Sequence, residues 1–354
     1  MAVTPLARVH LGNIQANWRA LDTVFPAAET GAVVKANSYG LGASEVTAAL
    51  AGVGCKTFFV AYGEEGYDVR IAAGNDAAIY AFNGLSAGSE VNWGPDAVRP
   101  VLNSAEDAGR WLAEAGADAQ FGLMIDTGMN RLGVRIDQIG ALLQSLGDRQ
   151  PALVMSHLAC ADEPGSPDNE RQLDSFLTVA AAFPGVPASL ANSAGHGLGP
   201  AYGLDLTRPG LALYGGGPAP PGVSLAPSVT VEAPILSVQS VQAGERVGYG
   251  GTHVVNEPAT LATVSLGYAD GVPRSSSNRG FVALDGLVCP IVGRVSMDLI
   301  TVDVSGSQGL AKPGAVVEFL GQTASLDEQA NRAGTLGYEL LTGMGRRVER
   351  IYER

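Results

Sequence analysis

The first two thirds of the chain alternate short apolar runs with amphipathic segments. Runs such as GAVVKA (31–36) and AQFGLMID (119–126) predict buried strands, and NERQLDSFLTVAAAF (169–183) predicts a helix from its apolar spacing. About eight strand–helix units over residues 8–225 predict an α/β fold with a (β/α)8 TIM-type barrel, with an open doubly wound sheet as the alternative. Function is then expected at the carboxyl ends of the strands. The remaining predicted strands are ARVHL, TFFVA, AAIYAF, VRPVL, ALVMSHLA and PASLANS.

The pattern changes after the Pro/Gly-rich segment PAPPGVSLAP (218–227). Beyond it, β-rich runs such as ATLATVSLGYADG (259–271) are separated by Gly and Asp turns, before a closing helix-to-strand segment. Residues 226–354 are therefore predicted to form a second, mostly β domain. Residues 1–7 are expected to pack on it.

Composition and charge narrow the classes of function. The 354 residues are 46% hydrophobic and 16% charged, with a formal net charge of −13 and no basic stripe, which argues against nucleic-acid binding. No apolar run is long enough to span a bilayer, and no signal-peptide pattern opens the chain. The three widely spaced cysteines, Cys55, Cys160 and Cys289, lack metal-ligand spacing, so no metal site is expected. We expect a cytoplasmic protein without membrane partners.

The segment VVKANSYGLG (33–42) carries the most specific chemical signal. Lys35 ends an apolar strand where a polar, Gly-containing segment begins. Burying a lysine there is unfavourable for packing alone, because its charged form resists desolvation. The position becomes useful if the amine stays neutral or forms a Schiff base. A strand-end lysine that simply reaches solvent is the alternative.

Nine motifs in order along nearly the whole chain resemble the alanine racemase family, which consists of pyridoxal-phosphate (PLP) enzymes with an N-terminal barrel and a C-terminal β domain. Any one of the motifs alone would be a weak signal, but their order and gaps are specific. The motifs are VVKANSYGLG, MIDTGMNRLG, SHLACAD, LANSAG, LTRPGLALYG, VGYGG, VSLGYADGVPR, CPIVGRVSMDLITVD and YELLTGMGRRVERIY.

The resemblance implies a racemase with two bases, one for each face of the substrate Cα. Lys35 matches the family lysine that holds PLP and serves as one base, and Tyr268 matches the catalytic tyrosine. In the family this tyrosine comes from the second subunit, so a homodimer with shared active sites is implied. His157 matches a histidine that contacts the tyrosine, although a histidine within the core is the alternative.

The resemblance also implies how the cofactor is bound. Arg208 matches an arginine that donates to the pyridine nitrogen, and since arginine stays protonated, the ring nitrogen should stay unprotonated. A weakened electron sink should then suppress transamination. Hydroxyl groups and backbone amides at a glycine turn form a plausible phosphate site. The residues carried over to the cofactor are Tyr39, Asn192, Ser193, Gly210, Leu211 and Tyr338.

Substrate binding is implied at three positions. Arg131 matches an arginine that meets the substrate carboxylate and the phenolic oxygen of the cofactor. Met297 and Asp298 match partner-subunit residues at the substrate entrance, although a lone Met is commonly core filler.

The chain departs from the family pattern at three positions. Met124 stands where many members carry a carbamylated lysine that braces the arginine matching Arg131, so we expect a bound anion such as chloride, or another side chain, to brace it. Ser189 and Leu41 replace histidines, and the hydrogen-bond relay from Arg208 should then end in a hydroxyl or water. These changes affect rate and pH profile rather than reaction class.

The predicted function is interconversion of L-alanine and D-alanine. A broad-specificity or serine racemase of the same fold is the first alternative, and a non-enzymatic PLP carrier is another. A hydride-transferring or aldolase-type barrel has less support, because no GxGxxG follows a strand and no metal-ligand cluster is visible. Tyr268 and the β-rich second half favour catalysis over a carrier.

Overall fold

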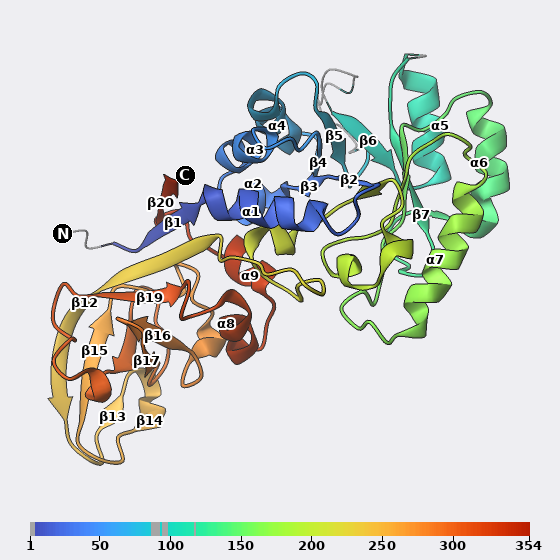
Figure 1. Ribbon diagram of the computed structural model, residues 1–354. Coiled ribbons are helices and arrows are strands. Elements are labelled where there is room, and N and C mark those ends of the chain that lie inside the picture. The colour runs from blue at the N-terminus through green and yellow to red at the C-terminus, as the bar shows by residue number, and fades with distance from the viewer. Residues whose placement is uncertain (1–3, 86–92, 94–97, 117) are drawn as a thin grey trace.

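The computed structural model describes residues 4–85, 93, 98–116 and 118–354. It consists of a barrel of parallel strands and a β-rich domain beside it (Figure 1). Among these residues, no helix combines the length and the apolar character needed to cross a membrane.

The N-terminal half is a closed ring of parallel strands, which confirms the predicted (β/α)8 barrel. β11 pairs with β2, and the Arg208 N–H donates to the Ala191 carbonyl at 2.9 Å, so the two ends of the sheet meet. Gly31 separates β2 from β3. The strands are β2 (Glu29–Thr30), β3 (Ala32–Val33), β4 (Thr57–Val60), β5 (Ala78–Ala81), β6 (Arg99–Leu102), β7 (Gly122–Asp126), β9 (Leu153–Met155), β10 (Ala188–Ser189) and β11 (Leu206–Thr207), with β8 (Val134–Arg135) beside β7.

Helices cover the outside of the ring, and their boundaries follow local sequence signals. Ser104 caps α5 by accepting the Asp107 N–H at 3.0 Å, and Pro167 opens α7. Every residue of β4 is buried, as expected for a parallel strand covered on both faces. The helices are α1 (Leu11–Asp22), α3 (Ala43–Ala51), α4 (Glu65–Ala73), α5 (Ala105–Glu114), α6 (Ile139–Leu146) and α7 (Pro167–Ala180). The segment labelled α2 (Lys35–Tyr39) is instead a short turn with left-handed backbone angles. Short 3-10 turns lie at 136–138, 194–197, 200–202 and 211–214.

The second domain is a mostly antiparallel β structure around the long strand β12. The chain of this domain reverses direction repeatedly at Gly and Asp turns. Two short helices close it against the barrel (Figure 1). Its strands are β12 (Val229–Val241), β13 (Arg246–Val247), β14 (His253–Val254), β15 (Ala259–Val264), β16 (Phe281–Leu284), β17 (Leu287–Pro290), β18 (Ile300–Asp303), β19 (Val316–Leu320) and β20 (Glu349–Glu353). The helices are α8 (Leu326–Ala333) and α9 (Gly337–Thr342), and 3-10 turns lie at 249–251, 274–276 and 305–307.

The first strand departs from the sequence expectation. The run ARVHL was predicted as a barrel strand, but β1 (Leu6–His10) lies between β12 and β20 in the second sheet. Its alternating burial fits a sheet with two different faces. We still propose that the chain divides into two domains near residue 225. Strand β1 then belongs to the sheet of the second domain, although it precedes the barrel in the sequence.

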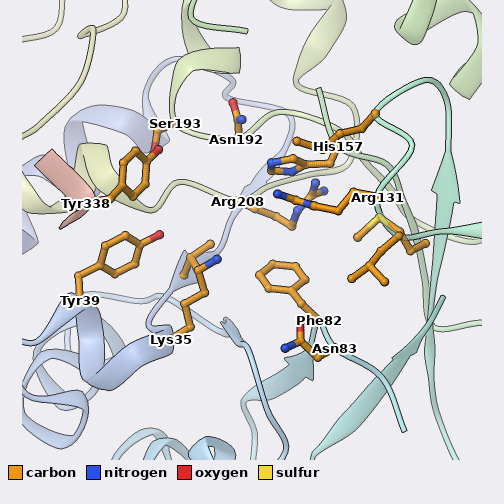
Figure 2. A pocket seen from close by; sticks show the side chains of 14 residues that line it. Lys35, Tyr39, Phe82, Asn83, Arg131, His157, Asn192, Ser193, Arg208 and Tyr338 are labelled. Carbon is orange, nitrogen blue, oxygen red and sulfur yellow. The ribbon is translucent and has the colours of Figure 1, made fainter. Parts of the chain in front are cut away.

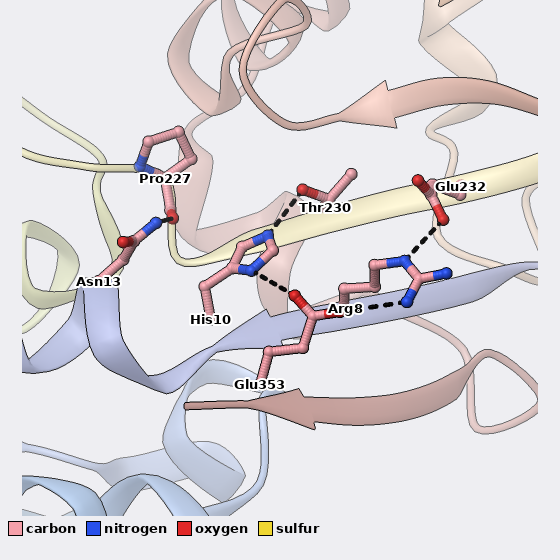
Figure 3. A network of polar contacts seen from close by, with 7 residues as sticks. All are labelled: Arg8, His10, Asn13, Pro227, Thr230, Glu232 and Glu353. Carbon is pink, nitrogen blue, oxygen red and sulfur yellow. Dashed lines mark hydrogen bonds and ion pairs between the residues drawn. The ribbon is translucent and has the colours of Figure 1, made fainter.

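A polar network fixes β1 to its two neighbours (Figure 3). Arg8 contacts Glu232 at 3.0 Å and Glu353 at 3.1 Å. The His10 ring contacts Glu353 at 3.1 Å and Thr230 at 2.8 Å. Each half-exposed ion pair stabilises by less than about 1 kcal/mol, so the network sets register more than stability.

Candidate active site

A cavity of about 470 Å³ opens where the carboxyl ends of the barrel strands meet. This is the location that the fold class predicts for function. Charged ends of Lys35, Arg131 and Arg208 point toward the same space (Figure 2). The predicted site residues that line it are Lys35, Tyr39, Arg131, His157, Asn192, Ser193, Arg208 and Tyr338, together with Met124.

Lys35 is held at the start of an unusual turn. The next four residues, Ala36 to Tyr39, all have left-handed backbone angles, with φ between 52° and 56°. Each non-glycine residue in this conformation costs roughly 1–2 kcal/mol, so strain concentrates beside the lysine. Burial, and secondarily the Arg131 charge, lower the pKa of Lys35. A lysine biased toward the neutral amine can act as nucleophile or base.

Arg208 is buried and faces the cavity without an acidic partner. It donates to the Ser189 hydroxyl and to the Ser156 carbonyl, and no carboxylate of the described residues forms an ion pair with it. Burial lowers the pKa of Arg208 to about 9, which still leaves it protonated near neutral pH. Ser189 donates in turn to the Leu206 carbonyl at 2.6 Å, so the relay passes through the expected hydroxyl and ends at a backbone carbonyl.

His157 lies beside these cations in its neutral form. Burial is the main cause that lowers the pKa of His157 to about 3, and the charges of Arg208, Arg131 and Lys35 act in the same direction. A neutral imidazole can donate at one nitrogen and accept at the other. His157 can therefore relay hydrogen bonds in the cavity without adding charge.

A cluster of hydroxyls and backbone amides forms one end of the cavity. The Ser193 hydroxyl oxygen accepts the Gly210 N–H at 2.8 Å and the Ala212 N–H at 3.2 Å, which leaves its own proton available to an anion. The Tyr39 and Tyr338 rings lie 5.8 Å apart beside it. Gly210 and Leu211 lie behind the lining rather than in it.

The departure from the family pattern at Met124 bears on how Arg131 is held. Both line the cavity, and the uncharged Met124 side chain is 7% exposed. In the described part of the chain, no side chain forms a hydrogen bond or ion pair with the Arg131 guanidinium. Bracing of Arg131 by another side chain is thus not found, and a small bound anion stays the proposal.

Three predicted residues lie elsewhere within the single chain. Tyr268 and Met297 are exposed on the second domain, and neither lines the cavity. Asp298 pairs with Arg347 at 2.7 Å, and Arg347 also holds the buried Asp270 at 2.6 Å. Adjacent backbone bonds join the Tyr268 turn to the Met297 segment. These three residues therefore lie outside the lining of the cavity.

Several residues with a place in the site were not singled out from the sequence. The Phe82 ring lies 5.9 Å from Lys35 Nζ, at the end of a barrel strand where the strand-end rule could have found it. Tyr249, in the VGYGG motif, is 73% exposed. Its turn packs on Arg294, three residues before Met297, so Tyr249 and Tyr268 flank the same segment.

The cavity fits pyridoxal phosphate. Its lining brings together Lys35, Arg131 and Arg208, so an anionic ligand is favoured. Arg208 offers buried, unneutralised donors for a ring nitrogen, and the Ser193 cluster suits a phosphate. Lys35 is the amine within reach for an aldehyde.

Family models match both halves of the chain. "Alanine racemase, N-terminal domain" covers residues 9–218, and "Alanine racemase, C-terminal domain" covers residues 228–352.

Individual relatives agree with these matches. The chain is 45% identical to an alanine racemase of Rhodospirillum rubrum, over 99% of this chain and 96% of that protein, and 43% identical to a catabolic alanine racemase of Agrobacterium fabrum, over 97% and 91%. Its structure resembles the biosynthetic alanine racemase of Pseudomonas aeruginosa, with a TM-score of 0.92 and 38% identity over all of both chains. It also resembles an alanine racemase of Bartonella henselae that carries covalently bound pyridoxal phosphate, with a TM-score of 0.92 and 36% identity over 99% of this chain and 100% of that one.

Proposed function

We propose, because the chain belongs to the alanine racemase family, that it interconverts L-alanine and D-alanine with pyridoxal phosphate as cofactor. The observation that carries this proposal is the cavity in which Lys35, Arg208 and the Ser193 cluster meet. The family models cover both the half with this cavity and the half with the exposed tyrosines.

Each end of the cavity has a binding task in this proposal. Pyridoxal phosphate supplies an electron sink that makes the substrate Cα proton acidic. Arg208 would hold the ring nitrogen as a hydrogen-bond donor, and Ser193 and Tyr39 would hold the phosphate, since all three side chains line the cavity. Asn192 and Tyr338 complete the cofactor contacts, with Gly210 and Leu211 shaping the backbone behind them.

Proton transfer needs a base on each face of the substrate Cα. Lys35 Nζ removes or returns the proton on one face, and the lowered pKa of Lys35 makes the neutral amine more accessible. A tyrosine hydroxyl of a second subunit serves the other face. His157, neutral beside Arg208, supports that hydroxyl.

A homodimer with shared active sites explains why catalytic residues lie outside the cavity. We propose Tyr268 as the partner's base, supported by its 43% exposure and its contact with the Met297 segment. Tyr249 is the second candidate, because its side chain is 73% exposed and flanks the same segment. Met297 and Asp298 of that surface would then reach the substrate entrance.

Alanine is the proposed substrate. Arg131 offers a guanidinium fork for the substrate carboxylate, and Tyr338 narrows the cavity on one side. A partner Met297 would narrow it further, which disfavours larger side chains. We propose a cytoplasmic location, because all three cysteines are free thiols.

Chiral chromatography tests the proposal directly. Purified protein with pyridoxal phosphate is incubated in parallel with L-alanine and L-serine. Fast conversion of alanine with little conversion of serine is expected. Comparable conversion of both would indicate a broad-specificity racemase, whereas no conversion with the cofactor bound at Lys35 would favour a carrier.

A further inference from the structure

Glu65, outside the cavity, contacts the backbone directly after Lys35. One carboxylate oxygen accepts the Ala36 N–H at 2.7 Å. The other accepts the Ala61 N–H at 2.7 Å and the Tyr62 N–H at 3.2 Å. Ala61 directly follows β4, and Ala36 lies just beyond β3. One side chain thus joins the carboxyl ends of two neighbouring barrel strands.

Ala36 is the first residue of the left-handed turn. Later residues of the turn are held by nearby groups: the Ser38 N–H donates to the Val34 carbonyl at 2.9 Å, and Asn37 accepts the Ala43 N–H at 2.8 Å. The first amide is instead held by a charged group that follows it by 29 positions in the chain. An alanine disfavours this conformation intrinsically, so an outside contact is needed to keep it there.

We propose that Glu65 is a positioning residue, which holds the Ala36 amide in the left-handed conformation and so keeps Lys35 Nζ aimed into the cavity. This inference rests on the proposed role of Lys35. The carboxylate form matters because it accepts at both oxygens. A glutamine at this position has one accepting oxygen and one donating amide, so it must lose either the Ala36 contact or the contacts with Ala61 and Tyr62.

Glu65 also acts on Lys35 through its charge. Burial lowers the pKa of Lys35, and the Glu65 carboxylate opposes that shift. Glu65→Gln should therefore lower the pKa of Lys35 further as well as loosen the turn. A residue that only stabilised the start of α4 would change neither property.

The test compares Glu65→Gln with Glu64→Gln, the neighbouring exposed carboxylate, which undergoes the same change of charge. Amide hydrogen exchange of Ala36 is measured on cofactor-free protein, together with the pH dependence of Lys35 reductive methylation. Only Glu65→Gln should raise Ala36 exchange, by about tenfold or more, and shift the methylation midpoint to lower pH. In the PLP-loaded enzyme, kcat should fall about 10- to 100-fold with KM for alanine within about twofold.

Ala36→Gly provides a rescue, because glycine adopts the left-handed conformation without a steric penalty. The Ala36→Gly/Glu65→Gln double variant should regain most of the lost kcat, and it should fold even if Glu65→Gln alone does not. Unchanged Ala36 exchange in Glu65→Gln, equal effects of both Gln variants, or no rescue would overturn the inference. A wild-type protein that fails to racemise alanine, while Glu65→Gln still alters exchange and methylation, would refute the proposed function alone.

Discussion

Gly210→Ala tests how tightly the phosphate end of the cavity is packed. A Cβ atom on Gly210 would collide with the Tyr39 hydroxyl oxygen and would lie 3.4 Å from Val33 Cβ. Tyr39 cannot withdraw easily, because it is 4% exposed and its ring packs 4.7 Å from the Tyr214 ring and 5.8 Å from the Tyr338 ring. The Gly210 φ of −126° is not a left-handed conformation, and the contact with Tyr39 is the effect that this variant tests.

The expected loss of stability follows from overpacking. Forcing an extra methyl group into a filled site costs about 1–3 kcal/mol. At about 2 °C per kcal/mol, the melting temperature of the cofactor-free protein should fall by about 2–6 °C. A displaced Tyr39 hydroxyl also loses its proposed hydrogen bond to the phosphate. At about 1.5–3 kcal/mol for a bond to a charged group, cofactor affinity should fall about 10- to 150-fold.

Calorimetry of the cofactor-free protein measures the change in melting temperature. Titration with pyridoxal phosphate, followed by absorbance, measures the change in cofactor affinity. Gly197→Ala is the matched control, because its added Cβ would meet nothing within 4 Å and its φ is not positive. A Gly210→Ala protein indistinguishable from the Gly197→Ala protein in both measurements would refute the packing argument.

Three further variants test the chemistry. Lys35→Ala should abolish the absorbance of covalently bound cofactor and lower racemisation by at least about 10³-fold, and retention of either would remove Lys35 from its role. Tyr268→Phe and Tyr249→Phe identify the proposed base of the partner subunit. The variant that removes this base should lose Cα proton exchange mainly from one enantiomer. Equal slowing from both enantiomers in both variants would contradict the two-base scheme. Because burial lowers the pKa of His157 from 6.5 to about 3, the unfolded state binds more protons between these values. Stability of the cofactor-free protein should then fall as pH decreases from 6.5 toward 3, and His157→Asn should reduce that loss in pH-dependent urea unfolding.

The local pattern of apolar and polar residues was sufficient to predict the barrel and most of the residues that line the cavity. Apolar runs and helical spacing are short-range properties, and parallel strands bring their carboxyl ends together wherever they form a ring. Lys35, Arg131 and Arg208 lie far apart in sequence but follow or end strands of the same ring, and all three line the cavity. The proposed roles of these residues came from the family motifs, because spacing alone left them open.

The sequence did not reveal the sheet to which β1 belongs. Residues 6–10 alternate in burial, a pattern that does not say which strands lie on either side of them. Their membership depends on pairing with β12 and β20, more than 200 and 300 positions later. Such non-local pairings have no signature within the strand itself.

The sequence by itself determined the fold class, the position of Lys35 at a strand end and the chemistry of an anion-binding cavity. The tertiary structure decided the left-handed turn after Lys35, since of the letters ANSY only Asn tolerates that conformation well and Glu65 holds the first amide of the turn. It also decided that Tyr268 is exposed and lies outside the cavity lining of its own chain. Both outcomes depend on contacts between distant elements, which an amino-acid pattern encodes only through the complete fold.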